Sequence, residues 1–132
     1  MLGHLGVNVG DLSQARAYYR ELMPLVGFES FLDNEDEFAY RPVNGKPGTY
    51  LFFYPAAETG QFSRHAPGLQ HLAFIVKTRS AVQEVFQAMV DSGSEPVHEP
   101  QVFPQYPQPY FAAFWLDPDG VLLEAVCHHD RP

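Results

Sequence analysis

The sequence has little cysteine, few basic residues and no long apolar run. Its single cysteine, Cys127, excludes an internal disulfide and fits a reducing compartment. Only 8 Lys and Arg stand against 16 Asp and Glu, and the formal charge of −8 argues against nucleic acid, anionic membranes and highly anionic substrates as partners. No apolar run could span a bilayer, and the first strand begins too early to leave room for a signal peptide. We therefore expect a cytoplasmic protein.

The residues that are abundant indicate one folded domain. The chain has 132 residues, 45% of them apolar, with 11 Phe and 7 Tyr. This composition is typical of a globular chain with a real core. Cys127 ends an apolar run, so a half-buried packing thiol is favoured over a catalytic one.

The order of the predicted elements occurs twice along the chain. In the first half, a strand around His4 leads into a helix that Asp11 and Gln14 open with a capping signal, and strands over 28–32, 38–41 and 49–54 follow. In the second half, a strand around His71 leads into a helix opening at Ser80, followed by strands near 95–98, 110–116 and 121–126. We predict an α+β protein of 132 residues in one domain: two βαβββ modules, about 1–55 and 69–128, joined by a linker over 56–68.

Three residues on three separate strands are candidate metal ligands: His4, His71 and Glu124. The two histidines hold matching places in the repeat. Glu124 lies within an apolar strand and shares the face of Leu122 and Val126, where an unpaired charge is costly. Two imidazoles and one carboxylate form a known binding face for one divalent ion, and they suit Fe, Mn, Ni, Co and Zn alike. Three protein ligands also leave positions open for a small-molecule substrate.

Other residues near these strands leave alternatives open. Phe52 stands four residues after Gly48, as Glu124 stands four after Gly120, so the first half offers no matching carboxylate. Tyr106 and Tyr110 lie in or beside a proline-rich loop over 99–109, and either core packing or a catalytic contact with substrate fits them. The remaining histidines, His65, His98, His128 and His129, are interpreted as surface residues, although one of the C-terminal pair could lie near the metal.

The chain resembles the vicinal oxygen chelate superfamily, which includes glyoxalase I, bleomycin-resistance and fosfomycin-resistance proteins and extradiol dioxygenases. The resemblance is carried by the paired βαβββ order, the His71-Leu72-Ala73-Phe74 strand, and Asp117-Pro118-Asp119-Gly120 followed by Leu123-Glu124. It implies a curved, mixed eight-stranded sheet around a central metal site held by His4, His71 and Glu124. It also implies a homodimer, since such proteins pair their modules within or between chains.

The resemblance implies a metal-dependent enzyme acting on a small, oxygen-chelating organic substrate, by a dioxygenase or a glyoxalase-like lyase or isomerase route. Phe52 replaces the fourth ligand of glyoxalase I, which argues against that activity. The basic residues Arg41, Lys46 and Arg64 are too few and scattered to favour a phosphonate substrate. Extradiol enzymes use further Tyr and His residues, a role open to Tyr106 and Tyr110. The alternative is a non-catalytic ligand-binding or drug-sequestering protein of the bleomycin-resistance type. Binders of that type lack the metal ligands, so the presence of all three here argues against a purely sequestering role.

Overall fold

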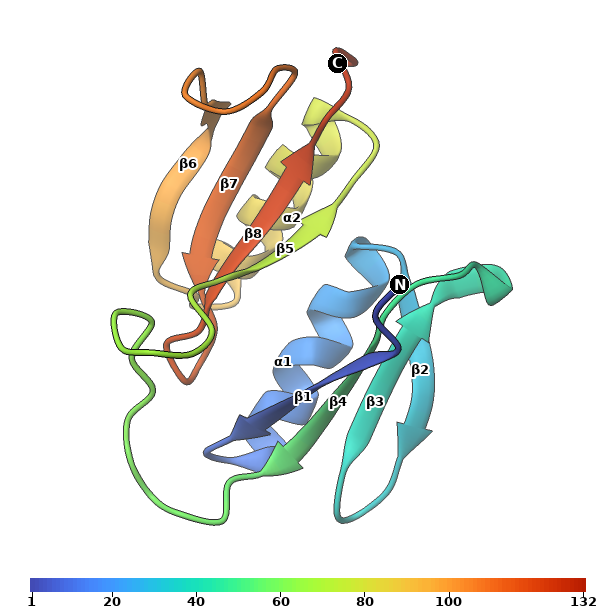
Figure 1. Ribbon diagram of the computed structural model, residues 1–132, viewed down its shortest axis with the longest axis vertical. Coiled ribbons are helices and arrows are strands. Elements are labelled where there is room, and N and C mark those ends of the chain that lie inside the picture. Colours follow the sequence, from blue (N-terminus) through green and yellow to red (C-terminus); the bar gives the residue numbers. More distant parts are fainter. The chain divides into compact units, whose positions relative to one another are not determined.

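The computed structural model describes residues 1–132, and the chain divides into two compact units, residues 1–61 and residues 62–132. Each unit combines four strands with one α-helix, and the helix lies against one face of the sheet (Figure 1). The predicted α+β class and the two βαβββ modules are confirmed. The eight strands are divided between two four-stranded mixed sheets, one in each unit.

The elements follow the same order in both units. Unit 1 contains β1 (His4–Val9), α1 (Leu12–Leu25), β2 (Phe28–Asp33), β3 (Phe38–Pro42), a 3₁₀ turn (Val43–Gly45) and β4 (Tyr50–Pro55). Unit 2 contains β5 (Leu72–Ile75), α2 (Arg79–Asp91), β6 (Pro96–Val102), β7 (Phe111–Leu116) and β8 (Leu122–Cys127). Neither helix has the length and apolar character that crossing a membrane requires.

The two sheets have the same topology. The strand orders are β1-β4-β3-β2 and β5-β8-β7-β6, and in each sheet the first and last strands of the module pair in parallel while the other pairs are antiparallel. The repeat inferred from the sequence is therefore a repeat of strand order and direction as well.

Two elements of unit 2 differ from the sequence prediction. The N-cap of α2 is Thr78, not Ser80, because the Thr78 backbone is extended and its hydroxyl accepts a hydrogen bond from the Ala81 N–H at 3.0 Å. Strand β6 continues to Val102 and contains Pro100, within the predicted loop. Proline is tolerated there because β6 is an edge strand whose pairing with β7 is interrupted on either side of His98.

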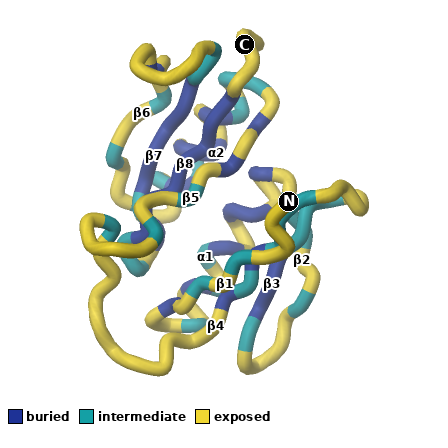
Figure 2. The backbone as a smooth tube through the Cα atoms, viewed as in Figure 1, coloured by how far each residue is buried: buried dark blue, intermediate teal, exposed yellow.

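The helix of each unit defines a core face of the sheet. In unit 1, the ring of Tyr19 on α1 lies 4.3 Å from that of Phe53 on β4. In unit 2, the guanidinium of Arg79 on α2 lies 5.2 Å from the Phe111 ring of β7. Side chains alternate along a strand, so Trp115 shares the helix side with Phe111, whereas Phe114 points to the opposite face. Strands β7 and β8 are buried almost throughout (Figure 2).

Candidate metal centre

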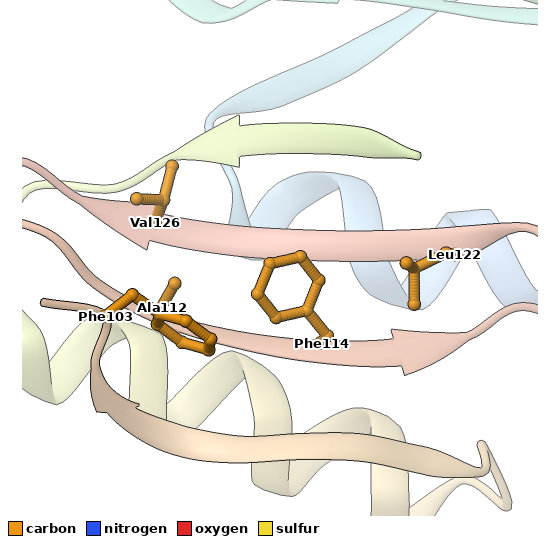
Figure 3. Packing of buried hydrophobic residues seen from close by; sticks show 5 residues of the cluster. All are labelled: Phe103, Ala112, Phe114, Leu122 and Val126. Atoms are coloured by element: carbon orange, nitrogen blue, oxygen red, sulfur yellow. The ribbon is translucent and has the colours of Figure 1, made fainter. Parts of the chain in front are cut away.

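Glu124 is the fully buried carboxylate at the middle of β8, with a side chain that is 0% exposed. It lies on the face turned away from α2, opposite Phe114 of β7 in the strand register. The apolar cluster on this face is shown in Figure 3 and comprises Phe103, Ala112, Phe114, Leu122 and Val126. Burying a carboxylate in such surroundings costs several kcal/mol unless both of its oxygens find partners.

One oxygen of Glu124 has a strong partner. The hydroxyl of Tyr110, just before β7, donates a hydrogen bond of 2.6 Å to Oε2. Burial raises the pKa of the Tyr110 phenol well above its ordinary value, and the neighbouring Glu124 carboxylate raises it further. The phenol therefore keeps its proton and remains a donor at neutral pH.

The other oxygen of Glu124 faces the imidazole of His71. Oε1 lies 3.2 Å from Nε2 of His71, yet it receives no hydrogen bond. His71 immediately precedes β5, whose Ala73 is paired with Glu124, so His71 and Ala73 share the face of the carboxylate. Nδ1 of His71 contacts Oε1 of Gln70. A proton on Nδ1 can be donated to this carbonyl oxygen, and in that tautomer the lone pair of Nε2 is turned toward Glu124.

This arrangement fits a divalent cation. Two lone-pair atoms that face each other need a positive charge between them. Ligand atoms that share one ion at about 2.1 Å are roughly 3.0 to 3.4 Å apart, for octahedral or tetrahedral angles, and the observed separation of 3.2 Å lies in that range. A hydrogen bond from the outer nitrogen of a histidine to a carbonyl group is the usual support of a metal-binding imidazole.

The matching place in unit 1 is aromatic. Gly6 pairs with Phe52 in unit 1 as Ala73 pairs with Glu124 in unit 2, so the register agrees with the predicted correspondence of Phe52 and Glu124. His4 begins β1, is exposed, and lies with its ring centroid 5.3 Å from that of Phe52. The face away from α1 carries four aromatic side chains in contact with one another: Phe31, Tyr50, Phe52 and Tyr54.

The structure thus brings together three of the five predicted site residues: His71, Glu124 and Tyr110. Tyr106 is 46% exposed and its ring lies 4.9 Å from that of Tyr110, without a hydrogen bond to Glu124. Within each unit, no three His, Cys, Asp or Glu side chains form a metal-binding group. His4 belongs to unit 1, and its role as third ligand stays a prediction.

Three residues that contact His71, Tyr110 or Phe114 were not assigned a role from the sequence. Gln70 orients His71, and the apolar run that contains both gave no signal for such a contact. His128 packs its ring edge-on to Tyr110 at 5.1 Å. His98 is exposed, as predicted, but its ring packs on Phe114 at 5.5 Å. Extending the strand alternation from Glu124 to residue 128 would have placed His128 on the same face.

Solved structures with the same fold cover nearly the whole chain. A protein of Bacillus halodurans that carries a provisional glyoxalase name is 29% identical, with a TM-score of 0.83 over 96% of this chain and 95% of that one. A glyoxalase/bleomycin resistance protein of Albidiferax ferrireducens is 21% identical, with a TM-score of 0.75 over 100% and 99% of the two chains. The fosfomycin resistance protein FosX of Listeria monocytogenes is 16% identical, with a TM-score of 0.71 over 98% and 94%.

None of the curated proteins matches the chain. The family model of the Glyoxalase/Bleomycin resistance protein/Dioxygenase superfamily matches residues 1–125, a range that extends from before β1 into β8 and includes His71 and Glu124. The chain therefore belongs to the glyoxalase/bleomycin resistance protein/dioxygenase superfamily.

Proposed function

We propose that the protein is a metal-dependent enzyme of the glyoxalase/dioxygenase type, acting on a small organic substrate that chelates the ion through its oxygens. The observation that carries this proposal is the buried Oε1 of Glu124, which faces the His71 imidazole at 3.2 Å and receives no hydrogen bond. Members of the superfamily commonly use a divalent metal, which agrees with this donor set.

Each residue of the proposed site has a distinct role. His71 and Glu124 are the ligands from unit 2, and we propose His4 as the ligand from unit 1. When bound, a divalent ion supplies Lewis acidity that holds and polarises substrate oxygens. Tyr110 keeps Oε2 of Glu124 engaged. Phe114 is paired with Glu124 in the strand register and Phe103 packs on Phe114, and the Glu124 side chain is fully shielded from water.

The surroundings favour a neutral or modestly charged substrate with an apolar body. Phe103, Phe114 and Tyr110 form a continuous set of ring contacts beside Glu124. The chain carries a net charge of −8, which opposes a highly anionic compound such as a phosphonate. The likeness to FosX concerns the fold, and we do not extend its resistance activity to this chain.

A ligand-binding protein without chemistry is the second candidate. The observation that favours it is the aromatic face of unit 1, where Phe31 is 45% and Tyr54 is 37% exposed. Such a face suits a flat apolar ligand. This candidate predicts ligand binding that persists after a chelator, whereas the enzyme predicts loss of turnover.

The first test is the metal content of untagged protein by mass spectrometry. We expect close to one ion per chain in the wild type and loss of most of it in Glu124→Ala, His71→Ala and His4→Ala. His65→Ala is the matched control, because His65 is exposed and lies outside the strands and helices, in the predicted linker over 56–68. Retention of the metal in Glu124→Ala and His71→Ala would show that these residues do not hold it.

We also make a proposal for the oligomeric state and the cellular location of the protein. Superfamily members often form dimers, and we propose that this chain forms a homodimer in the cytoplasm. Sedimentation equilibrium tests the assembly, with a mass near twice 14.9 kDa expected. A mass near 14.9 kDa at every concentration tested would contradict the dimer.

A further inference from the structure

The two carboxylate oxygens of Glu124 have different contacts in the structure. Oε2 is engaged by the Tyr110 hydroxyl at 2.6 Å, and Oε1 is left facing His71. A carboxylate that can rotate presents either oxygen, or both, to an ion. A short hydrogen bond to one oxygen removes this freedom and leaves a single ligand atom in a fixed direction.

Tyr110 is itself held from several sides, which a positioning role requires. Its backbone carbonyl accepts a hydrogen bond of 3.0 Å from the Phe103 N–H, and its ring packs against that of Phe103 with centroids 6.1 Å apart. The Tyr106 ring lies 4.9 Å away. Since these contacts involve the ring and the backbone, the hydroxyl is fixed without being needed for packing.

The segment after β8 adds a further support to this phenol ring. His128 packs edge-on to Tyr110 at 5.1 Å. The segment is tied to the start of α2 by an ion pair of 3.1 Å between Asp130 and Arg79 and by a hydrogen bond of 3.0 Å from the Arg79 N–H to the Arg131 carbonyl. The C-terminal residues therefore hold His128 against the tyrosine that orients Glu124.

We propose that Tyr110 is a positioning residue that fixes Glu124 as a one-oxygen ligand, with His128 supporting its ring. The inference rests on the proposed metal site and assigns Tyr110 a role through Glu124 instead of direct catalysis. Replacing a residue that hydrogen-bonds to a metal ligand and orients it typically lowers the metal affinity 10- to 100-fold. Removing only the hydroxyl should therefore weaken metal binding by about that factor.

The test compares Tyr110→Phe with Tyr106→Phe in Co²⁺ titrations of untagged, metal-free protein. Tyr106→Phe is the matched control, because this neighbouring tyrosine makes no hydrogen bond to Glu124. We expect the Kd for Co²⁺ to rise about 10- to 100-fold in Tyr110→Phe and to stay within about threefold in Tyr106→Phe. The visible Co²⁺ spectrum should also change in Tyr110→Phe alone, because the carboxylate can then bind through either or both oxygens.

Two further readouts, the unfolding free energy of the variants and Co²⁺ binding by the wild type and Glu124→Ala, separate the possible failures. The unfolding free energy of each metal-free variant shows whether the fold is intact, and the retained phenyl ring should preserve the packing of Tyr110. A Tyr110→Phe variant with the affinity and spectrum of the wild type would overturn the positioning role while leaving the metal site standing. A wild type that binds no Co²⁺, or a Glu124→Ala variant that binds it normally, would instead overturn the metal site and this inference with it.

Discussion

Glu124 is buried among apolar side chains, and its two oxygens meet a phenol on one side and an imidazole on the other. A hydrogen bond to a charged group contributes about 1.5–3 kcal/mol, which offsets only part of the several kcal/mol that burying the charge costs. The difference must be supplied at Oε1. Under the proposed function, a divalent ion shared with His71 would supply this stabilisation at Oε1 and would account for the burial of Glu124.

Gln70 should affect metal binding without affecting the fold. Its side-chain oxygen contacts Nδ1 of His71, so Gln70→Ala should release the ring and weaken metal binding about 10- to 100-fold. Gln87→Ala is the control, since Gln87 bonds to Asp91 on the surface of α2. Isothermal titration with Co²⁺ measures both variants. Equal affinities would show that the Gln70 contact does not orient the ligand.

Tyr40 should make stability depend on alkaline pH. Burial raises the pKa of this phenol above its ordinary value, and Asp33 adds to the increase while Arg20 and Arg16 oppose it. The unfolded chain therefore ionises first, so the contribution of Tyr40 is complete below pH of about 10 and is lost as the pH rises toward the folded pKa. Between pH 8 and 11, Tyr40→Phe should lose less unfolding free energy than the wild type in urea titrations. Parallel profiles would contradict this assignment.

For individual residues, the sequence predicted which side chains are candidates for the site but not which side chains they contact. Strand alternation placed Glu124 on an inward face, and the structure buries it completely. The bond from Tyr110 to Glu124 joins residues on different strands, and its geometry depends on how the loop before β7 folds. Alternation alone left Tyr110 open between packing and contact with substrate.

At the level of the elements, the two helices show when a local capping signal is sufficient to predict where a helix begins. The first helix begins as its capping signal predicts, because the Asp11 side chain accepts a hydrogen bond from the Gln14 N–H at 3.0 Å. Two hydroxyl residues, Thr78 and Ser80, stand near the start of the second helix, and residue type alone does not determine which of them has the extended backbone that a cap needs. The extended backbone at Thr78 decides the start of α2.

The cap of α2 can be tested by paired substitutions. Thr78→Ala removes the acceptor for the Ala81 N–H and should lower the unfolding free energy by about 1 kcal/mol. Ser80→Ala should change it by less than about 0.5 kcal/mol, because its hydroxyl caps no N–H group of the helix. Urea unfolding followed by circular dichroism measures both. A larger loss in Ser80→Ala would assign the cap to that residue.

Strand register decides which aromatic residues reach the site. From the sequence alone, either Phe114 or Trp115 could share the face of Glu124, because the pairing register of β7 is not known from the sequence. Phe114 is paired with Glu124 and shares its face, whereas Trp115 is paired with Leu123 and is fully buried on the side of α2. A shift of one residue would exchange the two, so composition alone could not settle their roles.

Across the whole chain, one repeated topology carries two different surfaces. Both units have the same strand order, which the repeated element order could predict because it follows from local patterns. Their matching positions have diverged, since unit 1 places Phe52 where unit 2 places Glu124. The repeat therefore combines a carboxylate–imidazole pair in one unit with an aromatic face in the other.

The division into two units predicts where a protease cuts first. Residues 56–68 are exposed except for the half-buried Arg64, which is the only lysine or arginine in this segment. Exposed connections between compact units are preferred sites of cleavage. Brief trypsin treatment should therefore cut after Arg64 and give fragments 1–64 and 65–132, which intact-mass analysis identifies. A first cut after Lys77 or Arg79, at the start of α2, would contradict this division.

Anomalous diffraction from crystals grown with Co²⁺ would show whether His71 and Glu124 share a metal ion. We predict an anomalous peak about 2.0–2.2 Å from both Nε2 of His71 and Oε1 of Glu124. The peak should be absent from crystals of Glu124→Ala. A wild-type structure with no peak at this place, and a direct hydrogen bond from a protonated His71 to Glu124, would contradict the metal centre and leave a structural ion pair instead.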